Sequence, residues 1–179
     1  MPTTLHEGYP SQYESKLTLK NGGEVFLRPI RDTDGPLLVE LFNMLSSQSV
    51  YFRFLRPLHA LSEDMLYHFT NVNYDSAFAL VAVIEEDGED AIIAVGRYAF
   101  DPRENVTDFS VAVRDDWQHL GLGKLLLKKI ITIGKEHGIP RFVSMIHSEN
   151  DAIKKTLRNL GYEVKYSLRS GSIFVELLV

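Results

Sequence analysis

A glycine-containing loop, QHLGLG at Gln118–Gly123, could bind an anionic group through its main chain alone. It lies between an alternating, strand-like stretch, Asn105–Val113, and a helix-like run that extends to about His137. The first N–H groups of a helix have no partner within the helix and carry a partial positive charge, so they attract anions. Gly121 and Gly123 would let such an anion approach the backbone closely. The loop therefore predicts a pyrophosphate site made of main-chain groups.

The same glycines could equally form a flexible entry into an amphipathic helix, because Gly-x-Gly is common beside a helix start. The chain contains neither G-x-x-x-x-G-K-[ST] nor G-x-G-x-x-G. The predicted helix has an apolar stripe for the core: Leu122, Leu126, Ile130 and Ile133. Lys124 falls in its first turn, where its charge opposes the helix dipole, and a bound anion would relieve that repulsion.

The loop and a later segment together resemble a known family. QHLGLG matches the [RQ]-x-x-G-x-[GA] pattern with which the GNAT superfamily of N-acetyltransferases binds the pyrophosphate of acetyl-CoA. NDAIKKTLRNLGYEV, from Asn150 through Gly161, is similar to the family's later helix, which begins at an Asn and ends in Gly followed by an aromatic residue. More narrowly, YPSQYESKLTLKNGGEVFLRPIRDTD, SSQSVYFRFLRP and FSVAVRDDWQHLGLG resemble the acetyltransferase domain of Pat-type protein-lysine acetyltransferases.

This resemblance, which covers about residues 15–179, implies a GNAT fold and acetyl-CoA as co-substrate. The strand before the loop would lie along the pantetheine arm, and the loop would hold the pyrophosphate. The residues that the resemblance assigns to acetyl-CoA are Val111, Ala112, Val113, Gln118, His119, Leu120, Gly121, Leu122, Gly123, Lys124 and Asn150. Asn150 could also be a simple helix N-cap.

The resemblance also places a general base at Asp108, because Pat-like enzymes carry a carboxylate on this strand. Asp108, Ser110 and Ala112 share one face of an alternating strand. Asp108 could instead be an ordinary edge or solvent-facing residue. As a base, Asp is shorter than the Glu usual there, which favours a bridging water, and burial would have to raise its pKa above about 3.9.

Other chemistries find less support in the sequence. The chain has no cysteine, so a cysteine acyl-enzyme and zinc–thiolate sites are excluded, and its six histidines lack metal-ligand spacing. Many GNAT members have a Tyr that acts as general acid toward the leaving thiolate at the position where this chain has Leu157. Tyr162 and Tyr166 could replace it, although packing explains both. His147 could line the cleft or be structural.

The surrounding elements predict one mixed α/β domain at 15–179 behind an N-terminal arm at 1–14. The expected order is ββααβββαβαββ, with hairpins beside helical crossovers and therefore a mixed, mostly antiparallel sheet. VYFRFLRPLH has too few arginines for single-strand nucleic-acid binding and is expected to contribute a short helix over the acceptor side. The final strand, SIFVELLV, could be buried or could pair at a homodimer edge.

No apolar run suggests a signal peptide or a membrane span, which leads us to expect a cytoplasmic protein. The net charge of −5 argues against broad nucleic-acid binding. The sequence thus predicts an acetyl-CoA-dependent N-acetyltransferase that needs no metal and acts by direct attack, with a protein lysine as acceptor. The resemblance to Pat-type enzymes implies a lysine on an acyl-CoA synthetase. A small-molecule amine acetyltransferase and a non-catalytic acetyl-CoA sensor stay as alternatives.

Overall fold

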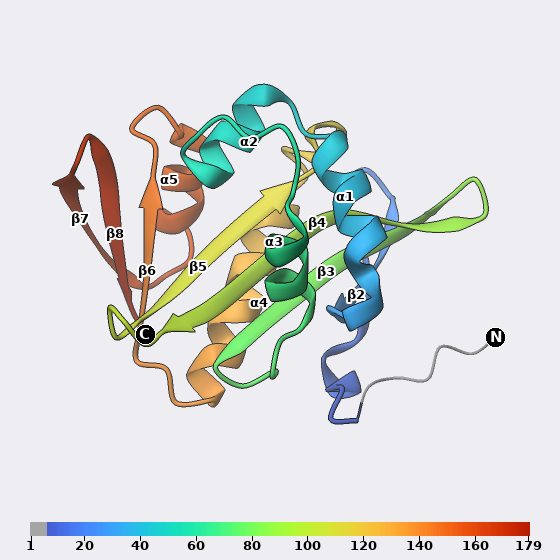
Figure 1. The fold of residues 1–179 in the computed structure, drawn as a ribbon, viewed down its shortest axis with the longest axis horizontal. Coiled ribbons are helices and arrows are strands. Elements are labelled where there is room, and N and C mark those ends of the chain that lie inside the picture. Colours follow the sequence, from blue (N-terminus) through green and yellow to red (C-terminus); the bar gives the residue numbers. More distant parts are fainter. Residues whose placement is uncertain (1–6) are drawn as a thin grey trace.

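The computed structural model describes residues 7–179, which form one eight-stranded sheet with helices on both faces (Figure 1). The strand order is β1-β2-β3-β4-β5-β6-β8-β7, and every neighbouring pair is antiparallel except β5 and β6. The strands are β1 (Ser15–Thr18), β2 (Glu24–Pro29), β3 (Ala77–Glu86), β4 (Glu89–Asp101), β5 (Val106–Val113), β6 (Arg141–Ile146), β7 (Glu163–Arg169) and β8 (Ser172–Leu178). The predicted mixed, mostly antiparallel fold is confirmed.

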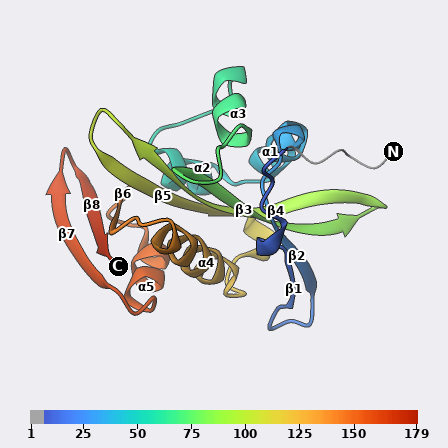
Figure 2. The ribbon, with the colours of Figure 1, turned by 90° about the horizontal axis from the view of Figure 1, so that it is seen from below.

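The helices divide between the two faces of the sheet (Figure 2). They are α1 (Gly35–Asn43), α2 (Ser47–Phe54), α3 (Glu63–Thr70), α4 (Leu122–Glu136) and α5 (Asp151–Arg158). The first three cover one face, and α4 and α5 cover the other. The stripe predicted for α4 is buried: Leu122, Leu126, Ile130 and Ile133 are all in the core beneath the sheet. Because each face of the sheet is covered, its central strands are apolar on both sides.

Short turns place the central strands in register. Asp87 and Gly88 have φ of 52° and 82°, and they form the two-residue connection between β3 and β4. Two consecutive positive φ angles match the right-handed twist of the flanking strands. The resulting hairpin pairs Ala77 with Ala99 and continues to the turn. This hairpin forms the centre of the sheet.

The pairing between β5 and β6 stops early and leaves a split in the sheet. In the described part of the chain the two parallel strands pair only at Thr107 with Phe142 and at Asp108 with Val143. Beyond this point β6 pairs with β8 alone, and the two strands diverge in Figure 1. The β6-facing backbone groups of residues 109–113 therefore have no strand partner, which leaves them available to a ligand.

One helix is missing from the expected order of elements. The order lacked α2, although a short helix was expected in VYFRFLRPLH, which overlaps it. Helix α2 begins behind Ser46, whose side chain accepts a hydrogen bond from the Ser49 N–H. A 3₁₀ turn at Asp32–Asp34 leads directly into α1. The last strand, β8, lies between β6 and β7, so the buried interpretation holds and the sheet edge is β7.

The described part of the N-terminal arm packs against the sheet. Tyr13 makes an edge-to-face contact with Phe78, and Tyr9 makes one with Tyr74. These contacts bury apolar ring surface at the end of the central hairpin.

Candidate active site

The loop before α4 has the backbone shape that the sequence suggested. His119 and Gly121 both have positive φ, at 64° and 84°, and Gly121 is the N-cap of α4 without any side-chain capping bond. Left-handed residues in a turn direct successive N–H groups to a common side, and the helix dipole adds positive potential there. The residues present thus fit an anionic group such as the pyrophosphate of acetyl-CoA.

The remaining loop residues are divided between the core and the surface. Leu122 is buried and Leu120 packs against the same core, whereas Lys124 is exposed in the first turn of α4. A Cβ atom on Gly123 would lie 3.5 Å from Val113 Cγ2. The start of α4 therefore lies directly against the end of β5, as the assignment of both segments to one ligand requires.

Gln118 and Ser49 join this loop to α2. The Gln118 side-chain amide donates to the Val113 carbonyl at 2.9 Å and to the Ser49 hydroxyl at 3.2 Å. Asp115 accepts from the Ser46 N–H at 3.0 Å and from the Ser49 hydroxyl at 3.2 Å. Because of these bonds, α2 is held against the loop that would carry the pyrophosphate.

Aromatic contacts hold the other side of α2 to the end of β6. The His147 ring stacks on Phe52 with centroids 5.7 Å apart and meets Tyr51 edge to face at 5.5 Å. His147 is therefore a packing residue beside the split, in line with its structural interpretation. Asn150 caps α5, its Oδ1 accepting from the Ile153 N–H at 3.2 Å.

Asp108 lies where β5 and β6 separate. It is opposite Ala99 on β4, and Arg97 is opposite Ser110, so Asp108 and Arg97 point to the face that α1–α3 cover. The Asp108 side chain is open to solvent, but enough protein surrounds it for desolvation to raise the pKa of its carboxyl above the ordinary value. The charges of Arg53 and Arg97 oppose this rise.

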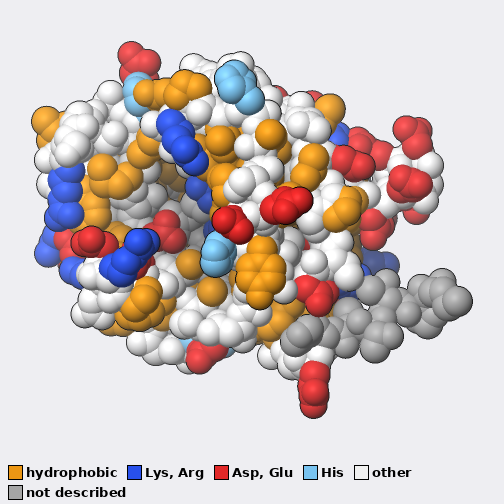
Figure 3. Space-filling view, viewed as in Figure 1, with side chains coloured by type: hydrophobic (Ala, Val, Ile, Leu, Met, Phe, Trp, Pro, Cys, Tyr) orange, Lys and Arg blue, Asp and Glu red, His pale blue; other side chains and the backbone are white. Residues whose placement is uncertain are grey.

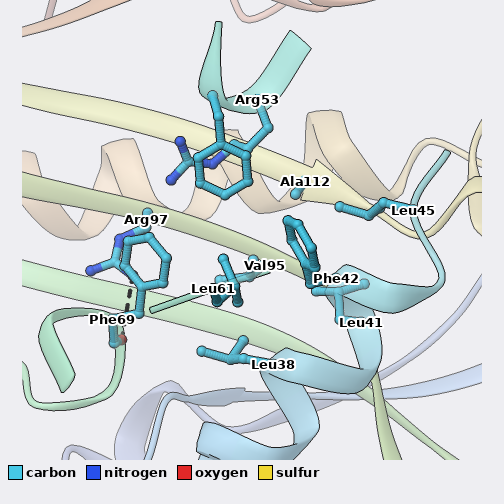
Figure 4. Close-up of a pocket in the computed structure, with 11 residues that line it drawn as sticks. Leu38, Leu41, Phe42, Leu45, Arg53, Leu61, Phe69, Val95, Arg97 and Ala112 are labelled. Carbon is cyan, nitrogen blue, oxygen red and sulfur yellow. Dashed lines mark hydrogen bonds between the residues drawn. The ribbon is translucent and has the colours of Figure 1, made fainter. Parts of the chain in front are cut away.

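A pocket with a volume of about 40 Å³ opens on the same face. The space-filling view of this face also shows a hollow with charged and apolar side chains around it (Figure 3). Its apolar lining includes Leu38, Leu41, Phe42, Leu45, Leu61 and Val95, and Ala112 adds a methyl group from β5. Arg53 from α2 and Arg97 from β4 come to the same side of the pocket (Figure 4). The pocket is therefore mostly apolar, with its charges gathered near the Asp108 side of β5.

Both arginines were missed as site residues by the sequence reasoning. Arg53 was considered only for nucleic-acid binding, and Arg97 was not considered at all. The signal was available for Arg97, because it interrupts the apolar strand sequence AIIAVGRYAF just as Asp108 interrupts its own strand. Burial lowers the pKa of Arg97 to about 10, with Arg53 adding to the decrease, so Arg97 stays protonated at neutral pH.

Comparison with known proteins decides the family. The model of the "Acetyltransferase (GNAT) family" matches residues 40–162, which include α2, β5, the loop and α5. The chain belongs to the GNAT acetyltransferase family. This family uses acetyl-CoA, in agreement with the anion-binding shape of the loop. The predicted enzyme class, an acyltransferase, is therefore confirmed at the level of the family.

Individual relatives agree with this assignment. Acetyltransferase PA5475 of Pseudomonas aeruginosa is 30% identical over 145 residues, which are 81% of this chain and 78% of that protein. Acetyltransferase Pat of Mycolicibacterium smegmatis is 27% identical over 153 residues, and the match covers 80% of this chain but only 42% of that protein. The crystal structure of the GNAT domain of S. lividans PAT superimposes with a TM-score of 0.85 at 27% identity, covering 96% of this chain and 99% of that one.

Within residues 7–179 no helix is both long and apolar enough to cross a membrane. In the same range no group of three His, Asp or Glu side chains is arranged to hold a metal ion.

Proposed function

We propose that this protein transfers the acetyl group of acetyl-CoA to a primary amine by direct attack, with Asp108 as the general base. The observation that carries the proposal is the position of Asp108 at the end of the β5–β6 pairing, between the unpaired stretch of β5 and the charged side of the pocket. Acetyl-CoA, when bound, supplies the activated acetyl group. The likeness to the Pat domain supports a protein lysine as the acceptor.

The chemistry explains why a base is needed there. A lysine amine with a pKa near 10.4 is neutral in only about one molecule in 10³ at pH 7, so its proton must be removed before attack. Desolvation raises the pKa of Asp108, which makes its carboxylate a better proton acceptor than an ordinary Asp. The short side chain favours transfer through a bridging water.

Main-chain groups would hold the thioester carbonyl and the pyrophosphate of acetyl-CoA. The unpaired β6-facing groups of residues 109–113 include backbone N–H donors that could hold the thioester carbonyl, where negative charge develops during attack. The N-terminus of α4 would receive the pyrophosphate, and Gln118, through the Val113 carbonyl, holds the loop against β5. Asn150, the N-cap of α5, begins the second family motif and is proposed to contact the CoA arm.

Replacing Asp108 tests the assignment. The Asp108→Asn variant should lose about 10²- to 10⁴-fold in kcat, the usual contribution of a general base, while its calorimetric affinity for acetyl-CoA stays unchanged. Glu104→Gln, a matched change in the exposed turn before β5, should leave both quantities as in the wild type. Full turnover by Asp108→Asn would remove Asp108 from the mechanism.

The acceptor is tested by a screen. Acyl-CoA synthetases and small amines should be incubated with the protein and acetyl-CoA, and the products read by mass spectrometry. Acetylation confined to small amines would replace the lysine proposal with small-molecule acetylation. Acetyl-CoA binding without transfer to any acceptor would point to a sensor and overturn the enzymatic proposal.

A further inference from the structure

The charges in the pocket do not balance. Arg53 and Arg97 bring two positive charges, and Asp108 is the carboxylate whose charge acts on both. Neither arginine forms an ion pair with a carboxylate in the described part of the chain. One of the two positive charges is therefore left without a counterpart. Such a charge in a mostly apolar environment is costly unless a ligand compensates it.

The hydrogen-bonding capacity of these arginines is also largely unused. A guanidinium has five N–H donors. Arg97 makes only long bonds, to the carbonyls of Phe69 at 3.3 Å and His68 at 3.4 Å, and otherwise lies over the Phe69 ring. The Arg53 guanidinium lies over aromatic rings, 4.8 Å from the centroid of Phe54 and 5.9 Å from that of Phe69.

Two buried arginines elsewhere in this protein, Arg28 and Arg114, donate short hydrogen bonds to carboxylates. Arg28 donates two bonds to Asp34 at 2.7 and 2.8 Å, and Arg114 binds Glu86 with two bonds at 2.6 and 2.8 Å. Arg114 also binds Asp116. Against these, Arg53 and Arg97 are two guanidiniums with free donors beside the proposed base.

We propose that Arg53 and Arg97 bind a carboxylate that the acceptor carries near its reactive amine. This inference rests on the proposed function and narrows its acceptor class. A carboxylate supplies the missing negative charge and matches the planar donors of a guanidinium. Without it, an approaching ammonium group meets two positive charges before it reaches Asp108, and that repulsion opposes binding.

The same chemistry could come from two sources. The carboxylate could belong to a small amino acid that is acetylated on its amine, or to an acidic side chain beside a lysine in a protein. In each case the aliphatic part of the acceptor would pack on the apolar lining of the pocket, and the amine would face Asp108.

Matched acceptors test this inference. One arm compares a series of linear amino acids, each with its amide, which differs only in the carboxylate. The other arm compares peptides in which a lysine is followed by Glu or by Gln. The wild type should prefer the carboxylate member in at least one arm by about tenfold or more in kcat/KM, as charge-assisted hydrogen bonds provide. The arm that shows the preference identifies the source.

Arginine variants assign the preference to the pocket. Arg53→Gln and Arg97→Gln should each bring the kcat/KM ratio of the two acceptors toward one. The ratio is the useful quantity because any effect of the lost charge on Asp108 applies to both acceptors and cancels. Arg56→Gln, a matched change at an exposed arginine just after α2, should keep the wild-type ratio. Unchanged calorimetric affinity for acetyl-CoA shows that each variant is folded.

The outcomes separate this inference from the proposed function. Transfer to both members of every pair at equal rates would overturn the inference and leave the acetyltransferase intact. A preference that survives in both Arg53→Gln and Arg97→Gln would also overturn it. Failure to acetylate any acceptor, despite acetyl-CoA binding, would overturn the proposed function and this inference with it.

Discussion

Two groups of charged side chains on this sheet differ in how completely they are paired. Arg28 and Asp34 are almost fully buried, bind each other through two short hydrogen bonds, and Asp34 also accepts from the Arg31 N–H at 2.8 Å. Burial alone would lower the pKa of Arg28, but its bonds to Asp34 raise it above the ordinary value. This pair connects β2 to the turn before α1.

Around Asp108 the opposite holds. The pKa of Asp108 is raised by desolvation and that of Arg97 is lowered by it, so both shifts disfavour the charged forms. Charges that stabilise a fold are paired and saturated with hydrogen bonds, whereas these keep donors and acceptors free. In the described part of this protein the candidate site therefore differs from the rest of the fold in that its charged side chains lack ion-pair partners.

Removing one carboxylate from each group should lower stability in one case and not in the other. Asp34→Asn breaks a buried ion pair and should lower the free energy of unfolding by about 3–5 kcal/mol. Asp108→Asn removes a carboxylate that is harder to ionise in the folded state, so at neutral pH it should not lower stability. Urea denaturation at pH 7 measures both. Equal losses would show that Asp108 is a structural charge and break the comparison.

Two glycines with the same backbone conformation sharpen the contrast further. Gly121 in the loop and Gly88 in the β3–β4 turn have φ of 84° and 82°, and a Cβ atom would meet nothing within 4 Å at either position. Alanine at each should cost about 1–2 kcal/mol of stability, because left-handed backbone is unfavourable for residues with a Cβ.

Affinity for acetyl-CoA should distinguish them. Only Gly121→Ala should weaken binding, because it disturbs the N–H groups before α4, and titration calorimetry measures the difference. If Gly88→Ala weakened acetyl-CoA binding to the same extent, the loop would have no special role.

The smallest expected effect concerns the pH dependence. The acidic limb of kcat/KM should lie above the pH expected for an ordinary Asp, because the proposed base, Asp108, has to be ionised to accept a proton and its pKa is raised. Arg53 lowers this pKa, so Arg53→Gln should move the limb to higher pH, by about half a unit given solvent screening. The acceptor in this measurement carries no carboxylate, and Arg56→Gln is the control variant. A shift to lower pH would contradict the proposed charge coupling.

Much of this protein could be predicted from its sequence. The hairpins, the loop before α4 and the buried stripe of that helix followed from local patterns, because periodicity and turn residues act over a few neighbouring positions. The family followed from the resemblance of QHLGLG and of the segment from Asn150 to Gly161 to GNAT proteins. The pattern of β5 also showed that Asp108, Ser110 and Ala112 share a face. A short helix was expected in VYFRFLRPLH, but α2 was left out of the element order, since an aromatic-rich segment with two arginines has no clear apolar stripe.

The tertiary structure alone decided what surrounds Asp108. Arg53 and Arg97 are 44 positions apart in the numbering of the chain, on α2 and β4, and no local pattern relates them. The β4–β5 register brings Arg97 to the face of Asp108, and the bonds from Asp115 and Gln118 hold α2 over it. Sequence determined which residues carry charge. Strand pairing and helix docking decided which of those charges would be left without a partner, because pairing depends on distance in space.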